Sequence, residues 1–333
     1  MAAEQANSTA NSPAQSRTST YSLCVIASRD RYGLAAALIY AALAFGFFGR
    51  DFTGGLSAVH LGRGPDPAFF MWLMAWWPHA LAHRENPFVS PNVWAPTGFN
   101  LAWETGIPLA SIGMAPLTAA FGPVASYNLL CLFCPMLAAW SAFVLARHLG
   151  ARWPAALFAG YIFGFSSYMM AEMIGGHPAL MLIFPVPLFF LIGLKAYAGA
   201  IRPLTFIAIA ALLIVTQFLL SAEIAATMEA FAALALFIGW YLADNTQRSR
   251  IVALIVPLIL ANCGAALILT PYLYSMLVAG IPQAAINSPA AFSTDLLNFV
   301  LPTPTVQIGT VAQLRAIAAR FPGNFGEAGG YIA

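Results

Sequence analysis

Acidic residues just beyond the first hydrophobic segment are the sequence's best candidates for chemistry. Asp66 precedes Pro67 and a run of aromatic residues, where a helix over 66–83 is predicted to begin. A carboxylate outside a membrane can accept a proton from an incoming hydroxyl or amine, as a general base does. An Asp before Pro is also a common helix cap, and on spacing alone that structural role is the more frequent one. Asp51, at the end of the first hydrophobic segment, could share the catalytic role or simply pair with Arg50.

A second polar group lies far along the chain. Glu172 and His177 flank Gly175-Gly176, whose lack of side chains lets the backbone approach another group closely. His177 could hold a phosphate or position an acceptor, or it could be an ordinary loop histidine that bonds to backbone.

Other carboxylates have weaker claims. Glu223 begins a hydrophobic segment, where stabilisation of the helix dipole is a sufficient explanation. Glu229 lies about two turns deeper, so it must be protonated, paired or face a wet cavity. Glu104 could line the same outer cavity as His79 and His83, but none of these has the spacing of a metal site. Cys131 and Cys134 form a CxxC inside an apolar segment, where small helix residues are the simpler interpretation.

The composition indicates a membrane protein. Hydrophobic residues make up 60% of the chain and charged residues only 8%, against about a quarter charged in soluble domains. The net charge of +2 gives no reason to expect nucleic-acid binding. Residues 1–28 are polar and lack the order of a cleavable signal, which predicts a disordered cytoplasmic tail.

Seven hydrophobic segments predict an all-α polytopic protein. Each is long enough to cross the roughly 30 Å hydrocarbon core, and they lie at about 32–48, 124–146, 153–171, 178–194, 203–220, 224–242 and 251–273. Between residues 124 and 273, loops that carry Lys or Arg alternate with loops that carry neither. Because cytoplasmic loops are rich in Lys and Arg, this alternation predicts a cytoplasmic N-terminus and cytoplasmic loops at Arg147/Arg152, Lys195/Arg202 and Arg248/Arg250.

The predicted organisation is a membrane module over 29–280 with a large outer loop at 50–123. Within that loop, the aromatic helix 66–83 is expected to lie flat at the membrane boundary, and residues 86–100 are expected to form an ordered irregular loop. The apolar stretch 107–121 is broken by Pro and Gly, and we expect it to be re-entrant or interfacial. Residues 281–333 are expected outside, with a short helix near 311–319, and the last five residues read like the start of a further, truncated span.

This arrangement resembles the C-type (GT-C) glycosyltransferases, polytopic membrane enzymes that use polyprenyl-phosphate sugars. Three short stretches carry the resemblance: 64–72 (GPDPAFFMW) at the place of the class's acidic-then-aromatic motif, 103–109 (WETGIPL) at its His-Pro-Pro-Leu-like turn, and 166–168 (SSY). The resemblance covers about residues 30–280. Pro67 occupies the place of the class's usual second acidic residue.

The resemblance implies a function at the outer face of a bacterial inner or plasma membrane, in cell-envelope synthesis. A sugar would pass from a polyprenyl-phosphate donor to an acceptor glycan, lipid or protein, with Asp66 as catalytic base, a role that Asp51 could share. Membrane lipids would surround the chain, no metal site is assigned, and a divalent metal could assist. The residues expected to bind substrate are Glu104, Glu172, His177, Glu223, Arg63, Arg84 and Trp103.

Two alternatives remain open at this stage. A lipid or small-molecule transporter or flippase would normally show internal repeats and interrupted helices in matching positions, and the sequence shows no convincing repeat. An inactive truncated membrane protein is the other alternative.

Overall fold

The computed structural model describes residues 31–52, 54–280, 288–324 and 326–331. The predicted tail at 1–28 lies outside these residues. The described chain is mostly helical, as predicted, with one two-stranded hairpin. Its elements are α1 (Arg31–Phe48), η2 (Gly49–Phe52), α2 (Asp66–His83), β1 (Val89–Ser90), β2 (Phe99–Asn100), α3 (Pro108–Gly113), α4 (Ala115–His148), α5 (Trp153–Gly164), α6 (Ser167–Gly175), α7 (Pro178–Met181), α8 (Pro185–Tyr197), α9 (Pro203–Leu220), α10 (Ala222–Leu242), α11 (Asn245–Ile268), α12 (Thr270–Ala279), η3 (Leu296–Phe299), η4 (Gln307–Thr310), α13 (Ala312–Ala318) and η5 (Gly326–Gly329).

Six stretches of the described chain are helical, long and apolar enough to cross a membrane. They are Ala115–His148, Trp153–Gly175, Pro178–Tyr197, Pro203–Leu220, Ala222–Leu242 and Asn245–Ile268. Six of the seven predicted spans coincide with them. The first predicted span is a shorter apolar helix, Tyr32–Phe48, so the predicted count of seven is not confirmed.

Two of the predicted spans are interrupted rather than continuous. The helix from Trp153 ends at Gly164, and Ser166 starts a new one by accepting a hydrogen bond from the Met169 amide. Serine favours this role because its side chain satisfies an amide that the first helical turn leaves free. The next span breaks between α7 and α8, where Pro185 begins the second helix. These breaks lie near the polar residues discussed below.

The segment predicted to be re-entrant forms short helical pieces. α3 spans six residues, and α4 is interrupted at Gly122, whose φ of 83° lies in the left-handed region. The apolar span therefore begins at Pro123. Neither α3 nor the piece before Gly122 is long enough to cross a bilayer alone.

The helix α2 begins and ends where predicted, and part of its aromatic surface packs inside the protein. Phe70, Trp76 and Trp77 are buried in the main hydrophobic core. The indole N–H groups of Trp76 and Trp77 donate to the carbonyls of Pro87 and Gly106, at 2.9 and 2.7 Å. Contacts with α3 and α4 and these two bonds to the following loop therefore fix the helix within the protein.

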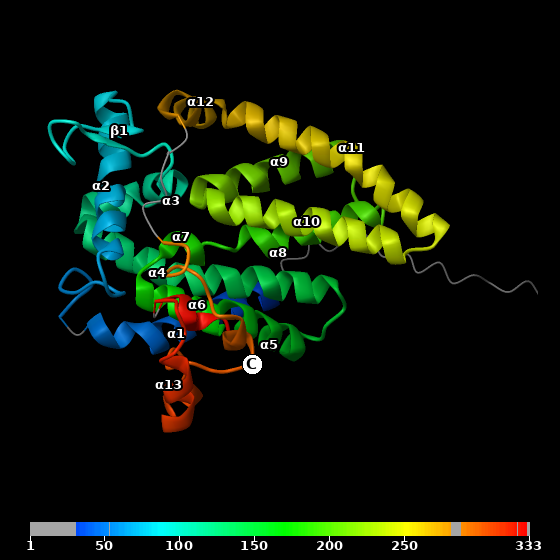
Figure 1. Ribbon diagram of the computed structural model, residues 1–333. Coiled ribbons are helices and arrows are strands. Elements are labelled where there is room, and N and C mark those ends of the chain that lie inside the picture. Colours follow the sequence, from blue (N-terminus) through cyan, green and yellow to red (C-terminus); the bar gives the residue numbers. More distant parts are fainter. Residues whose placement is uncertain (1–30, 53, 281–287, 325, 332–333) are drawn as a thin grey trace, which may run out of the picture. The chain divides into compact units, whose positions relative to one another are not determined.

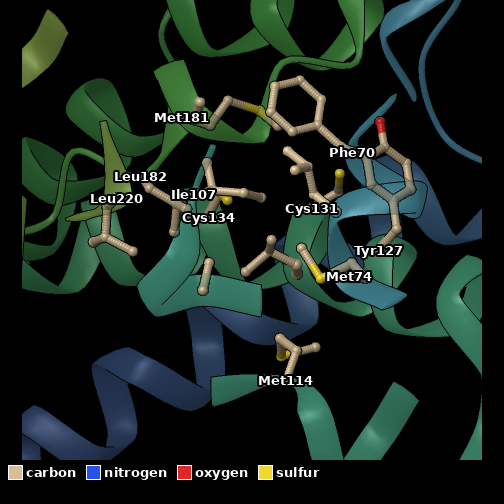
Figure 2. Close-up of a cluster of buried hydrophobic side chains, with 14 of the residues drawn as sticks. Phe70, Met74, Ile107, Met114, Tyr127, Cys131, Cys134, Met181, Leu182 and Leu220 are labelled. Atoms are coloured by element: carbon tan, nitrogen blue, oxygen red, sulfur yellow. The ribbon is translucent and has the colours of Figure 1, made fainter. Parts of the chain in front are cut away.

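The main core joins α2 to α4 and to the interrupted helices. Figure 2 shows Phe70 and Met74 of α2 beside Tyr127, Cys131 and Cys134 of α4, with Met181 and Leu182 near them. Cys131 and Cys134 are free and buried in this core, as the apolar interpretation of the CxxC predicted. In Figure 1, α2 lies at one end of the long helices α9, α10 and α11 and runs across their direction.

A Tyr-Asn pair at the start of the α4 span holds the loop that leads into α2. The fully buried Asn128 side chain donates to the carbonyls of Leu56 and Val59, at 2.8 and 2.7 Å, and accepts from the Leu61 amide at 2.9 Å. The Tyr127 hydroxyl lies 3.1 Å from the Leu61 carbonyl oxygen. Every polar atom of Asn128 is therefore satisfied, and the loop is fixed to the transmembrane helix.

We expect Asn128→Leu to lower the free energy of unfolding by about 3 kcal/mol, because three hydrogen bonds of about 1 kcal/mol each are lost. Ser141→Ala is the matched control, since buried Ser141 bonds only to Ala138 of its own helix. Denaturation of both purified variants measures the difference, and equal stabilities would contradict this role for Asn128.

Candidate functional site

His177 lies between two carboxylates. Its Nε2 is 2.6 Å from Oδ2 of Asp66, and its Nδ1 is 2.7 Å from Oε2 of Glu172. Asp66 and His177 are 111 residues apart in the chain. The structure therefore brings together three of the residues singled out in the sequence, as one hydrogen-bonded chain.

Asp66 does not act as the helix cap that its position suggested. α2 is preceded by Pro65, and no side chain caps its first turn. Asp66 is the first residue of the helix, and its side chain bonds to His177 instead.

The end of α6 places Glu172 and His177 on either side of a tight turn. Gly176 adopts a left-handed conformation (φ 75°), and the His177 amide donates to the Glu172 carbonyl at 3.0 Å while the Gly176 amide donates to Met173. This pair of bonds is the Schellman motif that commonly ends helices at glycine. It turns His177 back toward the Glu172 side chain.

Close backbone packing brings the two halves of the site together. A Cβ at Gly62 would lie 2.5 Å from Cα of Gly176, and a Cβ at Gly176 would lie 2.5 Å from the Pro67 ring. The Arg63 amide donates to the Ile174 carbonyl at 2.7 Å, and the Tyr127 hydroxyl lies 3.2 Å from the Gly176 carbonyl oxygen. The glycines predicted to allow a close approach therefore make one, to the loop before α2.

The ion pairs set the charge of the imidazole. The side-chain hydrogen bond to Glu172 is the largest cause that raises the pKa of His177, the bond to Asp66 and both carboxylate charges also raise it, and partial burial opposes them. Only an imidazolium has two N–H groups, so only the charged ring can donate to both carboxylates at once. The Asp66 side chain is 50% exposed and that of Glu172 only 16%, so Asp66 is the carboxylate that an incoming molecule can reach.

The two carboxylate bonds argue against His177 as a phosphate ligand. Both of its ring nitrogens already have carboxylate partners, so the ring has no N–H left for an anion. Arg63 is a cation that remains available for an anion. It is exposed, it lies three residues before Asp66, and its guanidinium has no hydrogen-bond or ion-pair partner among the described residues.

The remaining candidates divide into near and distant residues. Glu223 belongs to the same region, because Tyr168 of α6 is within electrostatic reach of both Glu172 and Glu223 and bonds to the Leu180 carbonyl at 2.8 Å. Arg84 follows the opposite end of α2, roughly 25 Å from Asp66 at 1.5 Å per residue. The side chain of Asp51 lies outside the described part of the structure, and its backbone belongs to η2.

Trp103 and Glu104 lie at a separate contact with α12. The Trp103 indole donates to Met276 at 3.1 Å, and the Tyr272 hydroxyl lies 3.5 Å from the Glu104 carbonyl oxygen. Burial raises the pKa of the Glu104 carboxyl. These two residues fasten the outer loop to α12 and do not contact the His177 group.

Across the described residues, no three His, Cys, Asp or Glu side chains converge as metal ligands do. The Asp66 and Glu172 carboxylates are held apart by the imidazole that binds them both.

Sequence inspection did not find Tyr127 and Asn128, which position the loop before Asp66. A signal was present, since a polar Tyr-Asn pair at the start of an apolar span is costly unless it is bonded within the protein. What the sequence could not give was the identity of the bonded partners, which are backbone groups about 70 residues earlier.

We expect Gly176→Ala to destabilise the protein by about 2 kcal/mol or more, since a left-handed alanine alone costs 1–2 kcal/mol and its Cβ would also collide with Pro67. Gly193→Ala in α8 is the control, because a Cβ there meets nothing within 4 Å. Thermal unfolding of the two variants compares them, and an unchanged midpoint for Gly176→Ala would contradict the close approach.

The raised pKa of His177 predicts a pH-dependent stability. The contribution of the imidazolium is fully present below the ordinary pKa of about 6.5 and is lost as pH rises through the raised pKa. We therefore expect the thermal midpoint of the wild type to fall more steeply than that of Glu172→Gln between about pH 6 and 9. His83→Gln, at an exposed helix end, should follow the wild type. Parallel curves for the wild type and Glu172→Gln would be evidence against the ion pair.

No family model matches the chain, and no curated protein or solved structure shows significant similarity to it.

Proposed function

We propose that this chain is a membrane glycosyltransferase that moves a sugar from a polyprenyl-phosphate donor to an acceptor at the outer face, with Asp66 as catalytic base. The observation that carries the proposal is the state of the Asp66 carboxylate: half exposed, not used as a cap, and fixed through one oxygen by His177. The resemblance of residues 64–72 to the acidic motif of GT-C enzymes supports it further.

The base acts through the oxygen that His177 leaves free. Oδ2 of Asp66 is bound to the ring, so Oδ1 is the atom that can face an acceptor hydroxyl. The ring therefore orients Asp66 through Oδ2 and leaves Oδ1 to the acceptor.

The proposed reaction is a single displacement at the anomeric carbon. The acceptor oxygen forms the new C–O bond and gives its proton to Asp66. The bond between the anomeric carbon and the phosphate oxygen breaks, and its electron pair leaves with the lipid phosphate. The exposed guanidinium of Arg63 is the group assigned to stabilise that charge, since a cation beside the leaving phosphate stabilises the charge that develops there.

The positions of the cationic residues along the helices support a site at the outer face of the membrane. Tyr127, at the start of the α4 span, contacts the site, whereas Arg147 lies in the last turn of the same helix. Lys195 in the last turn of α8 and Arg248 in the first turns of α11 also belong to loops between spans. With these cations in the cytoplasm, the site is outside, and we infer a bacterial inner or plasma membrane with a cytoplasmic N-terminus.

We expect Asp66→Asn to reduce sugar transfer by about 100- to 10,000-fold, the usual range for loss of a general base. The assay follows a radiolabelled sugar from polyprenyl-phosphate donors to acceptors in membranes that contain equal amounts of each protein. The asparagine keeps a hydrogen-bonding group of the same size beside His177, so folding should be retained.

Glu85→Gln is the control for this assay, because Glu85 is a carboxylate just beyond the opposite end of α2, near His79. It should transfer sugar at the wild-type rate. Wild-type transfer by Asp66→Asn would remove Asp66 as the base. Absence of any transfer by the wild-type protein, for every donor offered, would contradict the proposed activity itself.

A further inference from the structure

One exposed aromatic side chain on the outer loop has no role in the site described above. Trp94 lies between β1 and β2 and is 68% exposed, while the other large apolar residue exposed on this hairpin, Val89, is 42% exposed. A single exposed apolar side chain is common on protein surfaces, so exposure alone assigns Trp94 no role.

The backbone around Trp94 is built to present it. Its φ of 56° lies in the left-handed region, which is rare for a bulky residue. The conformation is held by two bonds to the Trp94 carbonyl oxygen, from the Thr97 hydroxyl at 2.7 Å and from the Gly98 amide at 3.1 Å. The loop thus holds a costly conformation whose result is an indole face directed away from the core.

A continuous set of aromatic rings links Trp94 to the first turns of α2. Trp94 packs edge-on against Phe99 with ring centroids 4.7 Å apart, and Phe99 packs edge-on against Phe69 at 6.1 Å. Phe69 follows Asp66 by one helical turn. Trp94 is therefore joined through two ring contacts to the helical turn that follows the proposed base.

The surroundings of Trp94 favour a carbohydrate over a membrane surface. Residues 86–100 contain no charged residue, so no cation in this loop adds electrostatic attraction to anionic lipid headgroups. The neighbouring exposed side chains are Asn92, Thr97 and Asn100. The side-chain amide of Asn92 has no hydrogen-bond partner among the described residues, while its backbone amide donates to the Ser90 hydroxyl. An exposed indole face beside neutral amides and hydroxyls matches a sugar ring, which presents C–H groups on one face and hydroxyls at its edge.

We propose that Trp94 is a stacking platform for a sugar ring of the acceptor, so that the acceptor is a neutral glycan extending from Asp66 toward the β1–β2 hairpin. This inference rests on the proposed function and narrows its acceptor class.

The test measures binding without transfer. Asp66→Asn protein in lipid nanodiscs is titrated with short linear oligosaccharides of mannose, galactose, glucose and arabinose. We expect at least one of these to bind, Trp94→Ala to weaken that binding about tenfold, and Trp94→Phe to retain most of it. Val89→Ala, on the same hairpin, is the matched control and should bind as the parent does.

Two results would overturn the proposal: no binding of any of these oligosaccharides, or equal binding by Trp94→Ala and its parent. A third is broadening of the Trp94 signal by paramagnetic lipid in fluorine NMR of 5-fluorotryptophan protein, which would place the indole in the membrane. Because binding is read separately, its failure counts against Trp94, whereas failure of the proposed catalysis is seen only in the Asp66 transfer assay.

Discussion

The arrangement of the candidate site depends on one imidazole ring bound between two carboxylates. His177 joins Asp66, which starts α2, to Glu172 of α6. Both bonds exist together only while the ring is charged, so the protonation state of His177 decides whether Asp66 is held. Since Asp66 is the reachable carboxylate, the same ring determines how the proposed base is oriented.

The rest of the fold brings these three residues within reach of one another. Asn128 and Tyr127 fix the loop before α2 to the α4 span, and Gly62 packs directly against Gly176 at the turn before His177. Burial of aromatic residues from α2 in the main core then fixes the helix itself (Figure 2). Polar contacts orient the side chains of the site, while apolar packing supplies the larger share of the stability of the fold around it.

Local signals in the sequence predicted the elements better than the contacts. The Asp-Pro start of α2, the apolar length of the spans and the short helix near 311–319 follow from local rules, and α2 and α13 lie where predicted. The breaks at Ser166 and before Pro185 were missed because apolar composition dominates those segments. Asp66, Glu172 and His177 were each recognised, but their pairing depends on a tertiary contact across 111 residues, which no local pattern encodes.

A measurement of the protonation state of His177 tests the ion pairs of the site most directly. Protein labelled with ¹⁵N in its histidines, studied by solid-state NMR in lipid, reports whether each ring nitrogen carries a proton, and His177→Gln identifies the signal. The account predicts a His177 ring protonated at both nitrogens above its ordinary pKa, which loses a proton at lower pH in Glu172→Gln. A ring that is neutral at that pH, and whose titration is unchanged in Glu172→Gln, would contradict it.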